Sequence, residues 1–558
     1  MLPFRAVLKS VLTKLNVFSN ETWFRHTTGR WLYNESERGF LESSLMSSTY
    51  LFWVELSVRR VEFDVASLKR VAAQAVGARQ CTNFKKVDEG SFNKVFLLEF
   101  DNQKNLIAKI PTRLIPPFYI TASEVATMNY ARTVLGLPVP RVLAWNAQSD
   151  RQRNPVGAEY ILMEKAHGDP LHSRLFTFEP QTAMAIVGQT ISLEQRFTWN
   201  KFSQIGSLYY KEDVDPALQE RPLYSIDTDS EDDHAERFRV GPLVDWDVWR
   251  GSRASLKADR GPWPDAAAYL RGLIHIEQMW LRQCAKPYPR PFDQWMEGSV
   301  ETHIDLLERL YVLAPYIIPP PEICTPVLWH TDLHAANIFV SPEETAEISS
   351  IIDWQSISVV PLYMQANFVK YARYNGQDVD MSGTAKLRAP IESWPPGERP
   401  RLKKEMRQAL IHQYYQTLVK QSSRWNYAVH LYPFLHHIRA STLYAARTWY
   451  QGPENIRESL FQIASAWDKM APGVPFPLKI DEAEMERHVV AYARREKYSS
   501  RVEELRRLMN MEADGWVSDE DFETAKAMND KLKASWDAEV EGGPYPFQDG
   551  APSWFVGS

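Results

Sequence analysis

The sequence predicts an α+β protein with two lobes, a small β-rich N-terminal lobe over residues 62–166 and a large α-rich C-terminal lobe over residues 167–475. Three observations lead to this expectation. Short apolar runs bounded by turn residues gather before residue 166, as in a sheet. Longer runs with helical periodicity dominate after residue 265. The chain has 558 residues, more than one hydrophobic core usually holds.

Two strands joined by a turn of small residues open the small lobe. Residues 87–100 are expected to form a strand, a turn at Gly90 and Ser91, and a second strand rich in apolar side chains. Such a turn lets backbone N–H groups come close to phosphate oxygens. A turn with one glycine is a weak signal alone, so its interpretation as a nucleotide-binding turn depends on the residues that follow.

A lysine between apolar neighbours follows in the strand expected at residues 105–111. A buried ammonium group needs a partner of opposite charge, and Glu124 in the helical run 121–131 can supply it. Lys109 would then pair with the α- and β-phosphates of a nucleotide. The alternative is an edge-strand lysine whose ammonium group reaches solvent.

The next apolar run, residues 159–166, is expected to end at the hinge between the lobes. There the backbone of Met163, Glu164 and Ala166 would meet the adenine edge of the nucleotide, with Met163 as one wall of the pocket. Gly168 would relax the chain into the second lobe. An ordinary core role for Met163 remains open.

A set of polar residues at fixed spacing lies between the apolar runs of residues 327–354. His330 and Asp332 share a turn, Asn337 comes five residues after Asp332, and Asp353 follows two isoleucines. Phosphoryl transfer needs a carboxylate to accept the proton of the attacking hydroxyl, and oxygen ligands that hold Mg²⁺ against the phosphates. Asp332 is therefore the candidate catalytic base, and Asn337 and Asp353 are the candidate metal ligands.

The alternative for each of these residues alone is structural, since a single Asp in a turn usually caps nearby backbone. Three residues of the required types at this spacing favour the catalytic interpretation. His330 is expected to tie the loop to neighbouring backbone, and His334 is expected to be incidental or to support the site from outside.

The ordered set of candidate residues resembles the aminoglycoside-phosphotransferase and choline-kinase-like branch of the protein-kinase-like fold. Trp354, in place of the Phe-Gly that follows the metal-binding Asp of protein kinases, indicates the same branch. The chain is also similar to the fungal "altered inheritance of mitochondria" phosphotransferase-like proteins, over about residues 20–475. Four segments carry this similarity: residues 28–35, 92–96, 123–128 and 155–160. The resemblance implies a two-lobed kinase-like fold, ATP and Mg²⁺ as cofactors and a mitochondrial location, with no assigned substrate.

The chain departs from the antibiotic-modifying members after Asp353. Those members carry Gly-Asp-Pro and a further Asp, whereas this chain has no carboxylate before Asp378. The resemblance thus supports the ATP side, with the hydroxyl of an unidentified small molecule as acceptor. No Ala-Pro-Glu segment follows Asp353, which disfavours a protein kinase. A mitochondrial pseudokinase that binds nucleotide or acts as a scaffold remains the alternative.

The N-terminus indicates a mitochondrial transit segment. Residues 1–20 contain no Asp or Glu, and on a helix their apolar side chains share one face that Arg5 and Lys9 avoid. A surface helix could show the same pattern. Residues 21–61 are expected to be an extension with an irregular insert at 41–58, either a disordered loop or a gene-model artefact. No run of about 18 apolar residues indicates a transmembrane segment.

Composition limits the partners of the protein. The net charge of −6 is small for this length and gives no basic footprint for nucleic acid. The three cysteines have no metal-ligand spacing and are expected to be reduced. Oligomeric state cannot be derived.

The large lobe is expected to be helical with loops of two kinds. Residues 213–236 are expected to form a long solvated loop. The Trp-bearing loops 241–250 and 260–264 either face the acceptor or serve packing. Residues 476–558 are expected to form a charged helical extension on the periphery. The remaining helical segments are residues 181–210, 265–281, 299–313, 403–421 and 427–450.

Overall fold

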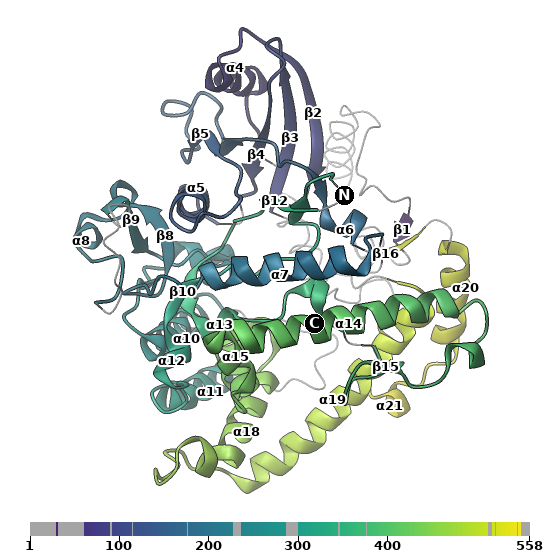
Figure 1. The fold of residues 1–558 in the computed structure, drawn as a ribbon. Helices are drawn as coiled ribbons and strands as arrows, with labels where there is room; N and C mark the ends of the chain where they lie inside the picture. Colours follow the sequence, from purple (N-terminus) through teal and green to yellow (C-terminus); the bar gives the residue numbers. More distant parts are fainter. Residues whose placement is uncertain are drawn as a thin grey trace, which may run out of the picture. The chain divides into compact units, whose positions relative to one another are not determined.

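The computed structural model describes residues 29–31, 61–89, 92–113, 115–175, 177–226, 236–285, 299–343, 346–374, 376–511, 516–518, 521–543 and 545–547. The chain forms two compact units, one of Leu56–His488 and one of Met1–Glu55 with Val489–Ser558. The larger unit contains both lobes (Figure 1). The expected transit segment, the insert at 41–58, Gly90 and Ser91 lie outside the described residues.

The small lobe is built on an antiparallel five-stranded sheet, which confirms the strands expected before residue 166. Its order is β2-β3-β4-β6-β5, so β4 lies in the middle with a neighbour on each side. Leu98, Leu106 and Leu162 point into a core that Phe96 completes. The strands are β2 Cys81–Glu89, β3 Asn93–Phe100, β4 Asn105–Pro111, β5 Val142–Asn146 and β6 Tyr160–Met163.

Helix α4, Val65–Val76, covers the core of this sheet. Asp64 caps its first turn by accepting a hydrogen bond from the Ser67 N–H. Gly77 ends it at φ +66°, the left-handed conformation common after a helix C-terminus. Leu68 of α4 is fully buried against the sheet.

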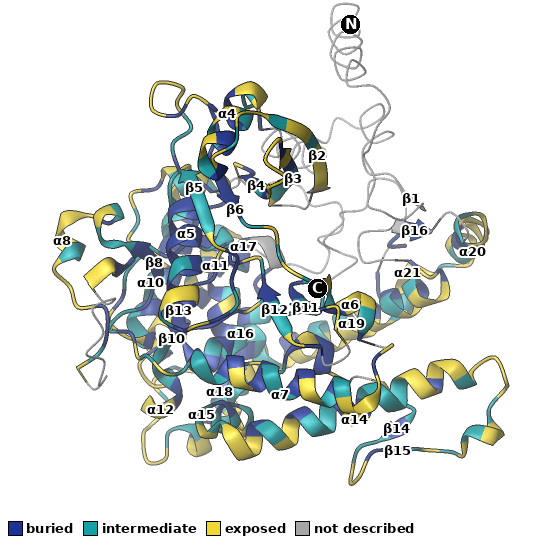
Figure 2. Cartoon of the chain, turned by 45° about the horizontal axis from the view of Figure 1, so that its top comes forward, coloured by how far each residue is buried: buried dark blue, intermediate teal, exposed yellow. Residues whose placement is uncertain are grey.

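Helix α5, Tyr119–Thr133, is buried on most of its surface (Figure 2). One of its contacts is a two-stranded sheet of β8, Ser207–Tyr210, and β9, Phe238–Gly241. This corrects the helix expected over residues 181–210, because the helix α7 ends at Arg196. Residues of β8 pair with a strand about 30 positions away, a partner that local periodicity does not reveal.

The large lobe is helical, and the helices expected at 265–281, 299–313 and 403–421 are confirmed. Residues 427–450 form three helices rather than one run, with Pro433 between the first two, where it lacks the N–H that a continuous helix needs. The longer helices are α7 Pro180–Arg196, α10 Ala266–Cys284, α11 Val300–Leu313, α14 Arg399–Ser422, α15 Arg424–Leu431, α16 Leu435–Ala445 and α18 Glu454–Met470, and the short helix α17, Thr448–Gln451, precedes α18.

The connections between these helices contain short strands and short helical turns. β11, Ile338–Val340, pairs with β12, Ile348–Ile351, and with β7, Asp169–Pro170. β10, Pro326–Leu328, pairs with β13, Val359–Pro361. The other short elements are α6 Leu171–Arg174, η1 Lys211–Asp213, α8 Pro216–Gln219, α9 Trp246–Trp249, η3 Gly251–Ser255, α12 Pro321–Cys324, α13 Leu362–Gln365, η5 Lys370–Ala372, β14 Val379–Asp380, β15 Lys386–Leu387 and η6 Ile391–Ser393.

The smaller unit has its own hydrophobic core. Tyr498, Leu505 and Phe547 are among the side chains that fill it. β1, Gly29–Trp31, pairs with β16, Trp516–Ser518, and therefore joins the two ends of the chain within this unit. The helices expected after residue 476 are confirmed as α19 Glu482–Leu508, α20 Phe522–Ala534 and α21 Ala538–Glu541. Within the described residues, no helix has the length and apolar character needed to cross a membrane.

A buried acid joins α7 to α14 in the large lobe, where the two helices lie side by side (Figure 1). Glu194 is 4% exposed and accepts a hydrogen bond from the Tyr415 hydroxyl at 2.5 Å. Burial raises the pKa of Glu194 to about 8, because no cation compensates the loss of water around its carboxylate. Glu194 is therefore mostly protonated at pH 7.

We expect the Glu194→Gln variant to be more stable than the parent above pH 8 and nearly unchanged at pH 5. Because the folded-state pKa lies above the unfolded value, the stability that this acid contributes is present below pH 4.5 and lost as the pH rises through about 8. A neutral amide avoids that loss, on the order of 5 kcal/mol above pH 8. Urea unfolding from pH 5 to 9 measures it, with the exposed Glu179→Gln as control. An equal effect of Glu194→Gln at both ends of the range would contradict the assignment.

Candidate active site

Lys109 lies in the middle of the small-lobe sheet and is buried. Its strand, β4, pairs with β3 and β6, and Lys109 is 5% exposed. The Nζ atom lies 2.6 Å from Oε1 of Glu124, which α5 places beneath the sheet. The expected partner of Lys109 is therefore present, and the alternative of an edge-strand lysine reaching solvent is wrong.

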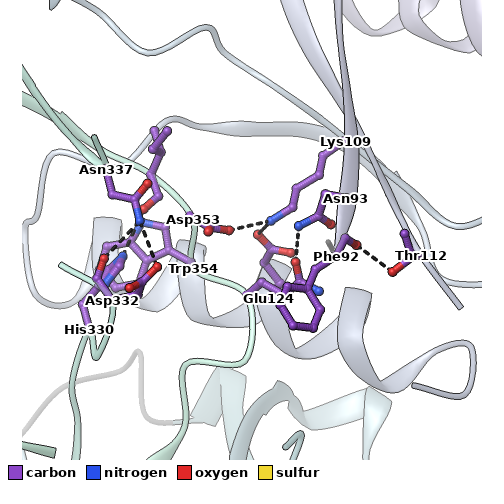
Figure 3. Close-up of polar contacts among 12 residues, drawn as sticks. Phe92, Asn93, Lys109, Thr112, Glu124, His330, Asp332, Asn337, Asp353 and Trp354 are labelled. Carbon is purple, nitrogen blue, oxygen red and sulfur yellow. Dashed lines mark hydrogen bonds and ion pairs between the residues drawn. The ribbon is translucent and has the colours of Figure 1, made fainter. Parts of the chain in front are cut away.

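The same ammonium group contacts Asp353 from the large lobe. The distance from Lys109 Nζ to Asp353 Oδ1 is 3.1 Å, although the two residues are 244 positions apart in sequence. Figure 3 shows Lys109 between the two carboxylates. Burial alone would lower the pKa of Lys109, but Glu124 and Asp353 outweigh it and raise the pKa above its usual value. Lys109 therefore stays charged at neutral pH.

Asp353 is held in a conformation that few residues adopt. Its φ is +64°, in the left-handed region that disfavours side chains with a Cβ. The next residue, Trp354, is fully buried and donates its indole N–H to the Ile351 carbonyl at 3.0 Å. Burial would raise the pKa of Asp353, but the Lys109 ammonium outweighs it and the pKa is lowered. The surrounding packing thus fixes an ionised carboxylate at the mouth of the site, with a side chain 43% exposed.

Asp332 and Asn337 lie together on the loop before β11. The Asn337 amide donates to the Asp332 carbonyl at 3.0 Å, and its distance to Asp332 Oδ2 is 3.4 Å. Because the amide nitrogen faces Asp332, the Asn337 oxygen is the atom that the residue can offer to a cation. Asn337 and Asp353 fit the ligand chemistry of Mg²⁺, which takes a few side-chain oxygens and completes its shell from phosphate and water.

His330 has the structural role expected from sequence. It is 1% exposed, and its Nε2 lies 3.0 Å from the Ile352 carbonyl, directly before Asp353. Burial lowers the pKa of His330, so the ring is neutral and Nε2 carries the proton that it donates. The imidazole also packs against the Trp354 ring at 4.8 Å between centroids. His330 therefore connects the Asp332 loop to the Asp353 loop.

A lysine outside the predicted set contacts Asp332. Nζ of Lys370, at the start of η5, lies 2.5 Å from Asp332 Oδ1. The two side chains are about half exposed, 55% for Lys370 and 45% for Asp332. On the other carboxylate oxygen, Oδ2, His334 Nε2 approaches to 3.5 Å. With the Asn337 amide, three nitrogen-bearing side chains thus lie around the Asp332 carboxylate.

The segment expected to be the hinge connects the sheet to the large lobe. Met163 is 9% exposed and belongs to the core, in line with the alternative for this residue. The Glu164 N–H donates to the Arg141 carbonyl at 3.0 Å, so this N–H is already paired within the protein. Ala166 is partly exposed two residues further on.

Position 168 requires a glycine, because the backbone there passes close to β11. Its φ is +90°, and a Cβ built there would lie 2.1 Å from the Val340 carbonyl oxygen. The close approach arises because β7 pairs with β11, with Asp169 opposite Val340. The hinge is therefore packed directly against the strand that follows Asn337.

The Trp-bearing loops serve packing in this structure. Trp249 and Trp263 are buried, and the Trp249 indole donates to the Leu243 carbonyl at 2.7 Å. The Arg260 guanidinium lies 3.9 Å from the centroid of the Trp249 ring. These contacts favour the packing interpretation over an acceptor-facing one for both side chains.

Comparison with known protein families decides the class of this protein. A family model described as "Phosphotransferase enzyme family" matches residues 83–364, just over half of the chain. The chain belongs to this phosphotransferase family. The match begins in β2 and ends after β13, so it includes the elements that carry Lys109, Glu124, Asp332, Asn337 and Asp353.

Fungal relatives share most of the length of this phosphotransferase. A subtelomeric hrmA-associated cluster protein of Aspergillus fumigatus is 29% identical over 500 residues, which cover 83% of this chain and 94% of that protein. The "altered inheritance of mitochondria protein 9, mitochondrial" of Saccharomyces cerevisiae is 23% identical over 543 residues, covering 86% and 84% of the two chains. These relatives confirm the resemblance to the altered-inheritance proteins.

Solved structures of aminoglycoside phosphotransferases are among the structural matches. One crystal structure, of APH(4)-Ia, aligns at 11% identity with a TM-score of 0.35, covering 75% of this chain and all of that one. A ternary complex of APH(2")-IIa with streptomycin and ATP aligns at 12% identity with a TM-score of 0.33, covering 74% and 99%.

Two contacts of this phosphotransferase were not anticipated from its sequence. Lys370 lies 38 positions from Asp332 in sequence, so their spacing does not indicate a contact. The one signal in the sequence is that Lys370 is the first charged residue after Asp353. The second contact joins Asn93 on β3 to Gln355, two residues after Asp353, through the Asn93 amide and the Gln355 side-chain oxygen. No sequence pattern that we recognise marks that pair.

Proposed function

We propose that this protein transfers the γ-phosphate of ATP to a hydroxyl group of a small molecule, with Mg²⁺ bound at Asn337 and Asp353. The observation that carries the proposal is the contact of Lys109 with both Glu124 and Asp353. Three separate elements bring these charges together at the junction of the two lobes. Family membership supports phosphoryl transfer in general, and the charge arrangement supports a nucleoside triphosphate as donor.

Each residue of the proposed site has a defined task. Lys109, fixed by Glu124, binds the α- and β-phosphates, and Gly90 and Ser91 offer backbone N–H groups to phosphate oxygens. Met163, Glu164 and Ala166 are proposed to border the adenine. Mg²⁺ supplies positive charge at the phosphate oxygens when it is bound. Asn337 and Asp353 would hold the ion through their side-chain oxygens.

Asp332 completes the reaction as the general base. The acceptor oxygen forms a bond to the γ-phosphorus while the bond from that phosphorus to the β,γ-bridging oxygen breaks, so ADP leaves with the electron pair. The hydroxyl proton passes to the Asp332 carboxylate. Asn337 donates hydrogen bonds toward Asp332 and so keeps the carboxylate turned toward the acceptor.

A second candidate function is a pseudokinase that binds nucleotide without transfer. The ion pair of Lys370 with Asp332 favours it, because the Lys370 ammonium already occupies one oxygen of the carboxylate that would have to accept the proton. Loss of transfer on changing Asp332 separates the two functions, since a pseudokinase has no transfer to lose.

We expect Asp332→Asn to lower phosphoryl transfer by about 10²–10⁴-fold while ATP·Mg²⁺ affinity changes by less than about threefold. The amide keeps the shape of the side chain but cannot accept the proton. The measurement is ³²P transfer from ATP to a panel of hydroxyl compounds, with calorimetric ATP binding. Asp305→Asn, on the half-exposed surface of α11, is the matched control. Parent-like transfer by Asp332→Asn would contradict the base assignment, and absence of transfer by the parent protein would favour the pseudokinase.

We propose a mitochondrial location, which the names of the Saccharomyces and Yarrowia relatives support. We expect the full chain to enter mitochondria and the Arg5→Glu, Lys9→Glu double variant to remain in the cytosol, because import favours a basic, acid-free amphipathic start. Fractionation of yeast cells that express both forms with a C-terminal tag measures it. Equal mitochondrial signal from both would contradict import through residues 1–20.

A further inference from the structure

The segment that follows Asp353 carries positive rather than negative charge as far as Asp378. Between Asp353 and Asp378 the chain contains no Asp or Glu, whereas it contains Lys370 and Arg373. Asp378 itself is paired with Arg401 at 2.8 Å. Of these charges, Lys370 makes a direct contact with the proposed base, at 2.5 Å from Asp332 Oδ1. The positive charge of Lys370 therefore lies next to the proposed base and would repel a cationic acceptor.

The position of Lys370 is set by packing on both sides of it. Val369, Tyr371 and Ala372 are buried, so the 3-10 turn η5 turns Lys370 outward. The Tyr371 hydroxyl lies 2.7 Å from Oγ1 of Thr190 on α7. The anchored neighbours direct the side chain toward Asp332, and its ammonium group pairs with that carboxylate while the side chain remains 55% exposed.

One helix, α14, holds the same turn through its backbone. On α14, the Gln408 amide donates to the Tyr371 and Arg373 carbonyls, and His412 Nδ1 lies 2.9 Å from the Ala372 carbonyl. The turn is thus bonded to its surroundings at three successive carbonyls. This is the arrangement of a positioned side chain rather than of a lysine on a free loop.

We propose that Lys370 is a specificity-determining residue that binds an anionic group of the acceptor, so that the substrate is a hydroxy compound carrying a carboxylate or a phosphate near the reacting hydroxyl. This inference rests on the proposed phosphotransferase function and names the substrate class of the same site. The Lys370 ammonium pairs with Asp332 when no acceptor is bound. An acceptor anion replaces that carboxylate as the partner of Lys370.

The exchange of partners prepares the base for reaction. Once Lys370 has moved to the acceptor anion, Oδ1 of Asp332 is released, and the acceptor hydroxyl can donate to it. The oxygen then forms its bond to the γ-phosphorus, the bond to the bridging oxygen of ADP breaks, and the proton goes to Asp332. A neutral acceptor lacks the group that draws Lys370 away, and a cationic acceptor is repelled by it.

The experiment compares acceptors that share a skeleton and differ in charge. Glycerate, glycerol and 2-amino-1,3-propanediol form one set; gluconate, glucitol and 1-amino-1-deoxyglucitol form another. ³²P transfer from ATP gives kcat/KM for each compound with the parent, Lys370→Ala and Lys370→Glu. Lys386→Ala, which removes a more exposed lysine of the same lobe, is the matched control.

We expect the parent to prefer the acid in each set, and Lys370→Ala to lower kcat/KM for the acid by about tenfold or more, chiefly through KM. The neutral compound should change by less than about threefold with the same variant. Lys370→Glu should shift the preference toward the amine. The KM for ATP should stay unchanged in both variants, which a merely structural role of Lys370 would not predict.

The outcomes separate this inference from the function on which it rests. Transfer that prefers neutral or cationic compounds, or a preference for acids that survives in Lys370→Ala, overturns the inference and leaves the phosphotransferase function standing. Equal loss with all three charge classes in Lys370→Ala, with KM unchanged, makes Lys370 part of the transfer step and overturns its role in specificity. Absence of any transfer that depends on Asp332 overturns the proposed function, and the inference with it.

Discussion

Burial of one ammonium group is the constraint on which the site depends. An unpaired charge inside a protein costs several kcal/mol, so Lys109 is compatible with the sheet only if carboxylates surround it. Glu124 supplies one from the small lobe, and Asp353 supplies the other from the large lobe. Compensation of the Lys109 charge therefore depends on the position of the Asp353 loop, which lies 244 residues away in sequence.

The large lobe places the Asp353 carboxylate beside Lys109 by holding the Asp353 loop with packing and a hydrogen bond. Trp354 is fully buried, and His330 holds the carbonyl of Ile352 from the neighbouring loop. A neutral histidine suits this task because it donates one hydrogen bond without bringing a further charge into the core. The left-handed conformation of Asp353 is maintained by these contacts, as strained residues at functional sites usually are. The Asp332 and Asp353 loops thus behave as one packed unit.

Much of the arrangement follows from local sequence. The bounds of β4 matched the predicted strand, and Glu124 was the natural partner of Lys109 because a buried lysine requires an acid nearby. The structural role expected of His330, tying its loop to neighbouring backbone, is confirmed by its contact with the Ile352 carbonyl. By contrast, β8 was mistaken for helix because its partner β9 lies far along the chain. The contact of Lys370 with Asp332 depends on how η5 packs under α14, and no spacing rule reports that. The nucleotide turn at Gly90 and Ser91 stays a prediction.

The central claim is that the carboxylate next to Lys109 holds the divalent ion of a bound nucleotide. The most direct test is a titration of ATP binding against Mg²⁺ concentration, by calorimetry, for the parent protein and for Asp353→Asn. The account predicts that ATP affinity of the parent rises with Mg²⁺ and that this dependence is largely lost in Asp353→Asn, because the amide is a weaker ligand for a hard cation. The same Mg²⁺ dependence in both proteins would contradict the account.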